Sequence, residues 1–292
     1  HIVAVTAPLH PDTDHYAHMA FAMEVTMAAR ASGYDTLLLV DDDAYAGMDR
    51  AEETSLSDGM IVLDVSAHDE RVELARKGST PTVFIGLPED TEGLTCVDLD
   101  FEAGMRLAID ELVAQGHSRM ALVTQPPSVL RRESNYPLRV RAEFERHCAA
   151  RGVDAIVVAP EPDRASGALD EIAAQQPGPT ALLLNTVSAV AQSIGPELAS
   201  RGISIPADVS VVAVGMTPMA DRAPLPFDGI PLDPRLTCPV AVDLLVARMA
   251  GAEIPEVTLV APVFESRGTV GPARDGAADA ARTLAAASPR EV

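Results

Sequence analysis

The sequence has 292 residues, 47% of them hydrophobic, so the chain can bury one large core or two moderate ones. Its 22 basic and 43 acidic residues give a net charge of −21, which excludes strong binding of duplex DNA by this chain, because such binding depends on neutralising phosphates. No apolar run reaches the roughly 18 residues of a membrane span, so no membrane partner is expected.

The three cysteines and the first residues bear on where the protein works. Cys96, Cys148 and Cys238 are scattered and show no CxxC spacing, which is typical of buried thiols in a reducing cytoplasm. The opening HIVAVTAPLHPD lacks the basic leader of a signal peptide. We therefore expect a cytoplasmic protein, and we read His1 as a cut or mature terminus with a segment missing upstream.

Apolar runs alternate with helical patterns over the first part of the chain. Strands are predicted at residues 2–6, 36–40, 60–63 and 82–85, and helices at residues 19–32, 49–57 and 68–77. Gly33 and Gly78 follow two of these helices, as residues that end helices often do. This alternation predicts a parallel, doubly wound sheet.

The stretch 96–124 contains a strand end, a helix and a second strand. From 102 to 115 the apolar residues recur at helical spacing; Gly116 and His117 follow, and the run MALV at 120–123 predicts a buried strand. A strand, a helix and a strand within about thirty residues form a parallel crossover unit.

The alternation then repeats. Strands are predicted at 155–158, 180–184 and 209–214, and helices at 137–151, 164–175 and 187–201, the last interrupted at Gly195-Pro196. The proline-rich residues 223–234 predict a connector, 235–250 a helix and 257–264 a last strand. Two such series indicate two similar lobes rather than one sheet.

Three segments together resemble the LacI/GalR family of transcription regulators. In the first, Asp100, Gly104, Gly116 and His117 stand in the order of the family's crossover block. The second is ISIPADVSVVAV at 203–214, and the third is VTLVAPVFESRGT at 257–269. The resemblance covers roughly residues 2–272.

The resemblance implies a fold like that of the type I periplasmic binding proteins: α/β, with two doubly wound parallel-sheet lobes and three crossovers near Asp100, Gly229 and Val260. Residues 1–100 and 230–257 would form an N-terminal lobe, and residues 101–229 and 258–273 a C-terminal lobe. Residues 274–292 lie past the last family motif, and we expect a frayed or helical tail there.

The function implied by the resemblance is that of the effector-binding and dimerisation domain of a transcriptional regulator. A small-molecule effector, sugar-like or anionic, would bind in the cleft between the lobes, and operator DNA would bind through an N-terminal helix-turn-helix missing from this chain. A homodimer would form through the helices at 68–77 and 235–250. Neither a cofactor nor enzymatic activity is expected.

Ligands of parallel sheets bind beyond the carboxyl ends of the strands, so the loops there supply the candidate residues. His10, Asp12 and Tyr16 follow the first strand, and the family uses an aromatic residue near Tyr16. Asp64 follows the strand at 60–63. A metal site built from His10, His15, His18, Asp12 and Asp14 is an alternative. The ordinary reading is a polar loop that caps the next helix near Asp14.

The stretch after Thr124 carries four arginines, Arg131, Arg132, Arg139 and Arg141, together with Asn135. In the family, an arginine here grips the effector through its planar fork, which suits carboxylates, phosphates or vicinal hydroxyls. Either Arg139 or Arg141 could take that place. A solvated basic start of a helix is the alternative.

Two positions depart from the family pattern. After residue 184 the family commonly has Asn-Asp, where this chain has Asn185-Thr186, and after the next strand it has acids where this chain has Gly215-Met216. A site without those carboxylates fits an ordinary sugar poorly, so the effector would be less polar or anionic, or absent. Asn185, Gly215 and Met216 remain candidate ligand contacts.

Other classes of protein find less support. No G-x-S-x-G, H-E-x-x-H, P-loop or G-x-G-x-x-G motif is present. A run of aspartates at 41–43 could coordinate Mg²⁺ in an α/β enzyme, although such a run is usually a solvated turn. A solute-binding receptor of a transporter has the same fold and is the main alternative function.

Overall fold

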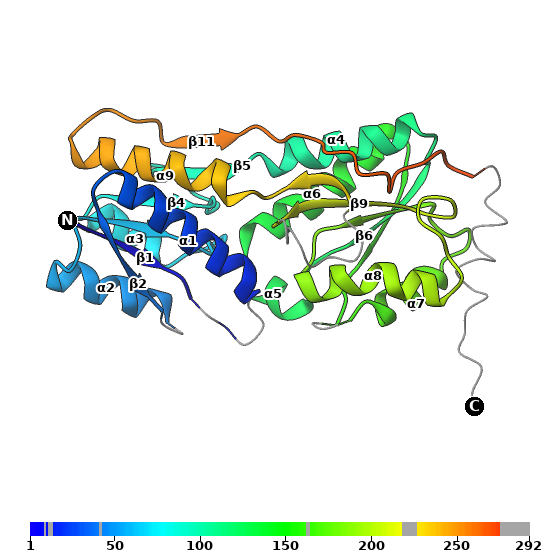
Figure 1. The fold of residues 1–292 in the computed structure, drawn as a ribbon, viewed down its shortest axis with the longest axis horizontal. Coiled ribbons are helices and arrows are strands. Elements are labelled where there is room, and N and C mark those ends of the chain that lie inside the picture. The colour runs from blue at the N-terminus through cyan, green and yellow to red at the C-terminus, as the bar shows by residue number, and fades with distance from the viewer. Residues whose placement is uncertain (9, 11–13, 41–42, 162–163, 218–226, 275–292) are drawn as a thin grey trace. The chain divides into compact units, whose positions relative to one another are not determined.

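The computed structural model describes residues 1–274, except residues 9, 11–13, 41–42, 162–163 and 218–226. They form two compact units (Figure 1). The first unit contains His1–Asp100, Arg132–Tyr136 and Asp233–Val260, and the second contains Phe101–Arg131, Pro137–Leu232 and the chain from Ala261. The chain thus changes unit after Asp100, Leu232 and Val260, and also on either side of residues 132–136.

A parallel sheet of six strands forms the centre of the first unit, in the order β11-β5-β4-β3-β1-β2. Its strands are β1 (Ile2–Thr6), β2 (Asp35–Leu39), β3 (Gly59–Val62), β4 (Thr82–Ile85), β5 (Cys96–Leu99) and β11 (Val257–Val260). Its helices are α1 (His15–Ala31), α2 (Ala44–Thr54), α3 (Arg71–Lys77) and α9 (Pro234–Met249).

Helices cover both faces of this sheet. Val3 and Val5 of β1 pack in one core cluster with residues of α1 and α9, while Ala4 packs in another with residues of α2 and α3. Strands β3 and β4 are buried along their whole length. Burial on both faces explains why these strands are continuous apolar runs rather than alternating ones.

The second unit has a parallel sheet of five strands in the order β10-β9-β8-β6-β7. The strands are β6 (Arg119–Val123), β7 (Asp154–Val158), β8 (Ala181–Leu184), β9 (Ser210–Met216) and β10 (Asp228–Pro231). The helices are α4 (Phe101–Ala114), α5 (Pro127–Arg131), α6 (Asn135–Arg151, from its third residue on), α7 (Ser166–Ala173) and α8 (Ser188–Ser200). The predicted α/β class with two parallel sheets is confirmed.

Buried polar groups explain two motifs of the sequence, the Gly116-His117 pair and the segment Arg267-Gly268-Thr269. The His117 ring lies 2.8 Å from Thr180 Oγ1 through Nδ1, and 3.0 Å from Ser210 Oγ and 3.1 Å from the Gly271 carbonyl through Nε2. It therefore links the starts of β8 and β9 to the C-terminal segment. Burial lowers the pKa of His117, which favours the neutral ring.

The buried Asp228 carboxylate holds the R-G-T segment. Its oxygens accept hydrogen bonds from the amide of Arg267, from Gly268 N at 2.7 Å and from Val270 N at 2.9 Å. Thr269 Oγ1 donates to the Val211 carbonyl at 2.6 Å. The segment is thus fixed to the second sheet through its backbone.

Several predicted elements are wrong in detail. The expected connector at 223–234 contains β10, an edge strand where Pro231 is tolerated because it ends the strand. Helix α8 runs through Pro196 without the predicted interruption. Strand β11 ends at Val260, not at residue 264, and α5 was not predicted. Helix α2 begins at Ala44 because Asp43 caps it, accepting from Ala46 N at 3.1 Å.

Of the predicted tail at 274–292, residues 275–292 lie outside the described residues. Among the described helices, each is too short or too polar to span a lipid bilayer.

Candidate functional site

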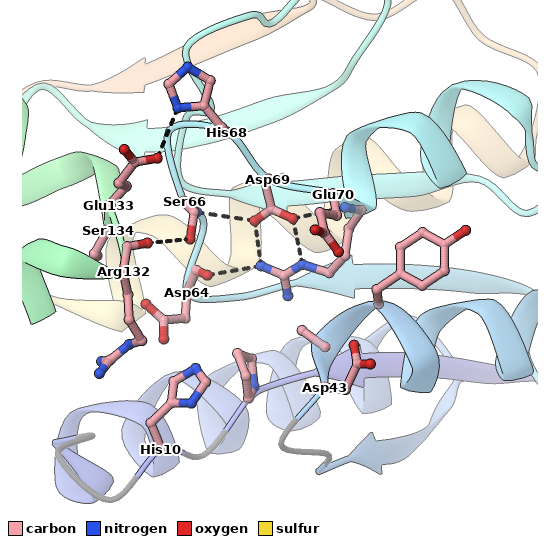
Figure 2. A pocket seen from close by; sticks show the side chains of 14 residues that line it. His10, Asp43, Asp64, Ser66, His68, Asp69, Glu70, Arg132, Glu133 and Ser134 are labelled. Atoms are coloured by element: carbon pink, nitrogen blue, oxygen red, sulfur yellow. Dashed lines mark hydrogen bonds and ion pairs between the residues drawn. The ribbon is translucent and has the colours of Figure 1, made fainter. Parts of the chain in front are cut away.

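A polar pocket of about 430 Å³ lies at the carboxyl ends of β1, β2 and β3 in the first unit (Figure 2). Its wall is built by the loops that follow these strands and by residues 132–134. It is lined by Pro8, His10, Asp43, Ala44, Tyr45, Asp64, Ser66, His68, Asp69, Glu70, Arg71, Arg132, Glu133 and Ser134. This is the edge at which parallel sheets bind ligands.

Arg71 fixes the loop that carries most of these residues. Its side chain is 3% exposed, and its guanidinium donates to Thr6 Oγ1 at 3.1 Å, to the Leu63 carbonyl at 3.0 Å and to the Asp64 carbonyl at 2.8 Å. It also forms a bidentate ion pair with Asp69, at 2.9 and 2.7 Å. A buried guanidinium needs this many partners. The result is a loop held rigidly at the end of β3.

Asp64 is held in an unusual backbone conformation, with φ at 53°. A non-glycine residue in this region costs free energy, and such residues cluster at functional sites. The Asp64 carboxylate lies 3.5 Å from His18 Nε2, and Figure 2 shows it facing the same space as the Arg132 guanidinium and the His10 ring. The loop thus presents a carboxylate to the pocket.

The charges around Asp64 keep it ionised. Burial alone would raise the pKa of Asp64, but His18, then Arg71 and Arg132, hold it below its ordinary value. Burial would likewise lower the pKa of His18, but Asp64 and then Asp14 raise it above its ordinary value. Between these two pKa values Asp64, which lines the pocket, is therefore paired with a charged His18.

His68 joins two acidic residues at the rim of the pocket. Its Nδ1 lies 2.9 Å from Glu133 and its Nε2 lies 3.0 Å from Glu89. Glu133 and then Glu89 raise the pKa of His68. The ring is 70% exposed, so water screens this pair strongly.

The second unit also presents polar groups at the carboxyl edge of its sheet. Asn185 is fully buried; its Nδ2 donates to the Val214 carbonyl at 2.8 Å, while its Oδ1 has no partner. Thr124 Oγ1 and Thr186 Oγ1 are buried and also unpartnered. Unsatisfied buried oxygens are rare in proteins, and three of them follow neighbouring strands here.

The predicted arginine clamp is already engaged within the protein. Arg139 makes a bidentate ion pair with Glu102 at 2.7 Å, and its Cζ lies 5.9 Å from the centre of the Phe101 ring. Arg141 pairs with Glu145 at 3.1 Å on the exposed side of α6. An anion that used either guanidinium would have to displace a carboxylate.

The other predicted site residues fall into distinct places. Of these, His10 and Asp64 line the pocket, whereas Tyr16 lies on the exposed surface of α1. Asn135 is buried and donates from Nδ2 to the Leu87 carbonyl. Asp12 lies outside the described residues.

Gly215 and Met216 end β9 in the second unit. Gly215 has a φ of 64°, and a Cβ there would lie 2.4 Å from Cε1 of Phe101, so only glycine fits beside this ring. Met216 is half-buried, and its carbonyl accepts from Leu232 N at 2.9 Å.

Some residues that line the pocket were not predicted as site residues from the sequence. Arg71, Asp69 and Glu70 fall at the start of a predicted helix, where a solvated face is the ordinary expectation. Arg132 was one of several basic residues in its loop. Their convergence depends on segments far apart in the sequence.

The aspartate run at 41–43 gives no metal site among the described residues, since Asp41 and Asp42 lie outside them and Asp43 caps α2. Within the described part of the chain, no group of three or more His, Cys, Asp or Glu residues could hold a metal ion.

The three cysteines are free and buried. Burial raises the pKa of Cys96 and of Cys148 to about 12, so neither thiol is a ready nucleophile.

These features define a class: an α/β binding domain of two parallel-sheet units, with a ligand-sized pocket at a carboxyl edge. Residues 109–270 match the periplasmic binding protein-like domain, more than half of the chain. The chain belongs to this family.

Comparisons with individual proteins agree with this assignment. Catabolite control protein A of Priestia megaterium is 24% identical over 165 residues, which make up 55% of this chain and 48% of that protein. The chain therefore matches about half the length of this curated relative.

Solved structures share the fold. A LacI family transcriptional regulator from Bifidobacterium animalis superposes with a TM-score of 0.82 at 19% identity, covering 94% of this chain and 98% of that one. The lac repressor dimer bound to operator and the anti-inducer ONPF superposes with a TM-score of 0.77 at 18% identity, covering 92% and 94%.

Proposed function

We propose that this chain is the ligand-sensing and dimerisation domain of a LacI-type transcriptional regulator. A small-molecule effector, sugar-like or anionic, binds at the pocket of the first unit. Operator DNA is bound by a helix-turn-helix outside this chain, and the protein works in the cytoplasm, where operator DNA lies. The observation that carries the proposal is a polar pocket with a fixed, charged Asp64 at the carboxyl edge of a sheet of this family.

The relatives support the regulatory role. The curated relative is named as a control protein, and the superposed structures are those of a LacI family transcriptional regulator and of the lac repressor. The lac repressor structure contains a dimer, an operator and a small molecule. A net charge of −21 agrees with DNA being bound elsewhere than on this chain. These findings do not favour a transporter receptor.

A homodimer requires a surface, and α1 offers one. Tyr16, Met19, Met23 and Met27 recur at helical spacing and are 44–60% exposed. Helix α1 lies beside α9 (Figure 1) and contacts β2, which is the edge strand of its sheet. An apolar stripe beside an uncovered edge is an aggregation liability unless a partner covers it. We propose a second copy of this chain as that partner.

This surface replaces one of the faces expected from the sequence. Helix α3 turns Glu73, Arg76 and Lys77 outward, and these form ion pairs with one another or with Asp90. Such a charged face is a poor centre for an interface. Helix α9 would contribute at the margin of the α1 stripe.

A thermal-shift screen of sugars, sugar phosphates, nucleosides and small acids tests the proposed function, with the mass in solution recorded in parallel. A ligand that binds only the folded chain raises its melting temperature by mass action. We expect at least one ligand to do so, and a dimeric mass. A ligand-binding monomer would instead favour a solute receptor, and a chain stabilised by no ligand would contradict effector sensing.

A further inference from the structure

The first unit has another pocket, of about 490 Å³, that shares no residue with the one described above. Its small lining residues are Ala75, Gly78 and Gly93, and its charged ones are Arg76, Asp90, Glu92 and Arg248. Gly78 belongs to the segment that leads into β4, and residues 90–93 belong to the segment that leads into β5. This pocket therefore lies at the amino ends of the strands, and we call it the amino-edge pocket.

Arg76 of α3 fixes the loop that forms one wall of the amino-edge pocket. Its Nη2 lies 2.9 Å from one oxygen of the Asp90 carboxylate, and its Nε and Nη2 donate to the Glu92 carbonyl at 3.1 and 2.9 Å. The other Asp90 oxygen accepts from Glu92 N at 3.0 Å, and Gly93 N donates to Glu256 Oε1 at 3.1 Å. Arg76 and Asp90 thus neutralise each other, and they hold the backbone of Glu92 in place.

Arg248, near the end of α9, supplies a second cation to the pocket. Its Nη1 donates to Oγ1 of the buried Thr95 at 2.6 Å. Within the described residues, Nε and Nη2 of Arg248 have neither a hydrogen-bond partner nor an ion-pair partner. A guanidinium has five N–H donors, so most of the donors of Arg248 stay available to a ligand.

Glu92 supplies the matching anion. Its side chain is exposed, and its carboxylate has no partner in the described part of the chain. Arg248 and Glu92 line the same pocket, yet no ion pair joins them among the described residues. Each backbone is fixed independently, that of Arg248 within α9 and that of Glu92 by Arg76. One cation and one anion are therefore held around one cavity without neutralising each other.

We infer that the amino-edge pocket binds a small zwitterion such as a free amino acid, with its carboxylate on Arg248 and its ammonium group on Glu92. A carboxylate accepts two parallel hydrogen bonds from a guanidinium, which fits the available Nε and Nη2. The same two nitrogens of Arg139 bind the Glu102 carboxylate in this protein. The site is separate from the pocket of the proposed effector.

The balance of charge selects this class of ligand. Since Arg76 and Asp90 are paired with each other, Arg248 and Glu92 are the charges left for a ligand. A singly charged ligand gains from one of these two residues and is repelled by the other, whereas a zwitterion gains from both. The small residues Ala75 and Gly93 leave room for the carbon chain between the two charged ends of the ligand.

Calorimetric titration would compare glycine, 4-aminobutyrate and 6-aminohexanoate, which differ in the distance between their charges. Each would be measured beside the carboxylic acid and the amine of the same chain length. We expect at least one of the amino acids to bind about tenfold or more tightly than both of its singly charged counterparts. A carboxylic acid that bound as tightly as its amino acid, or a failure of all three amino acids to bind, would overturn the inference.

Two variants test the residues that carry the site. Arg248→Gln and Glu92→Gln should each weaken binding of the best amino acid about tenfold or more, because each removes one of the two charges. Lys77→Gln and Glu53→Gln are the matched controls, since they make the same changes of charge at exposed residues outside the pocket wall. Equal affinities for Arg248→Gln and Lys77→Gln, or for Glu92→Gln and Glu53→Gln, would overturn the assignment.

Amide NMR of the unmodified chain locates the ligand without any substitution. We expect the backbone signals of Ala75 and Gly93 to shift as the best amino acid is added, because both residues line the amino-edge pocket. Ser66 and Ser134 line the other pocket and should be unaffected. Shifts at Ser66 and Ser134 with none at Ala75 and Gly93 would place the ligand in the other pocket and overturn the inference.

Discussion

The Asp64 carboxylate and the His18 ring stabilise the fold only while both are charged. The pKa of Asp64 is lower in the folded chain than its ordinary value, so its contribution is present above about pH 4 and is lost as the pH falls through the folded pKa. The pKa of His18 is raised, so its contribution is complete below about pH 6.5 and is lost as the pH rises through the folded pKa.

Asp64→Asn should therefore destabilise the chain more at pH 5.5 than at pH 9, by about 1 kcal/mol or more. Asparagine tolerates the left-handed backbone at this position, so the substitution adds little strain. The measurement is the free energy of urea unfolding at both pH values. Asp35→Asn, on the exposed start of β2, is the control. An equal loss at both pH values would contradict the charged pair.

Gly229 tests the close packing of β10 against the middle of β9. Its φ is 153°, and a Cβ there would lie 1.8 Å from the Ala213 carbonyl oxygen, so the backbone would have to move. Gly229→Ala should cost about 3 kcal/mol or more in unfolding free energy. Gly167→Ala is the matched control, because nothing lies within 4 Å of its added Cβ and it sits in a helix. Similar midpoints for the two variants in urea would contradict this account.

The two faces of helix α1 have different roles. One face packs Ala22, Val25 and Ala29 into the core, and the opposite face exposes the methionine stripe. Helices of a monomer rarely leave such a stripe uncovered. The second face therefore belongs to an interface in our proposal.

Met23→Glu with Met27→Glu should weaken self-association about tenfold or more, because charges would be buried at the centre of the interface. The residues are 56% and 60% exposed, so the fold should survive. Sedimentation equilibrium measures the dimer, and circular dichroism checks the fold. Leu107→Glu, at a residue 43% exposed on α4 of the second unit, is the control. Equal dimer constants for the two variants would rule out α1 as the surface.

For the whole molecule, the alternation of apolar runs and amphipathic helices was enough to predict the fold class. Strands such as β3 and β4 are buried on both faces, so they stand out as unbroken apolar runs. Element ends were predicted less well, since caps such as Asp43 move them by several residues.

From the sequence, only the site residues in the loops that follow predicted strands could be predicted. His10 and Asp64 meet this condition, and both line the pocket. Residues 132–134 were not predicted to line the pocket. Backbone hydrogen bonds with Val65 and Ala67 hold this segment in place, and backbone atoms are the same in every residue type. Burial of Arg71 was not predicted for another reason. This residue begins a short helix whose sequence is typical of a solvated face, yet its guanidinium is buried.

Calorimetric titration of the best ligand from the screen into the unmodified chain and into Asp64→Asn tests whether the effector binds at the pocket of the first unit. We expect binding to the unmodified chain and at least tenfold weaker binding to Asp64→Asn, since the carboxylate would no longer accept hydrogen bonds from the ligand. Equal affinity for both chains would show that the ligand binds elsewhere and would contradict effector sensing at this pocket.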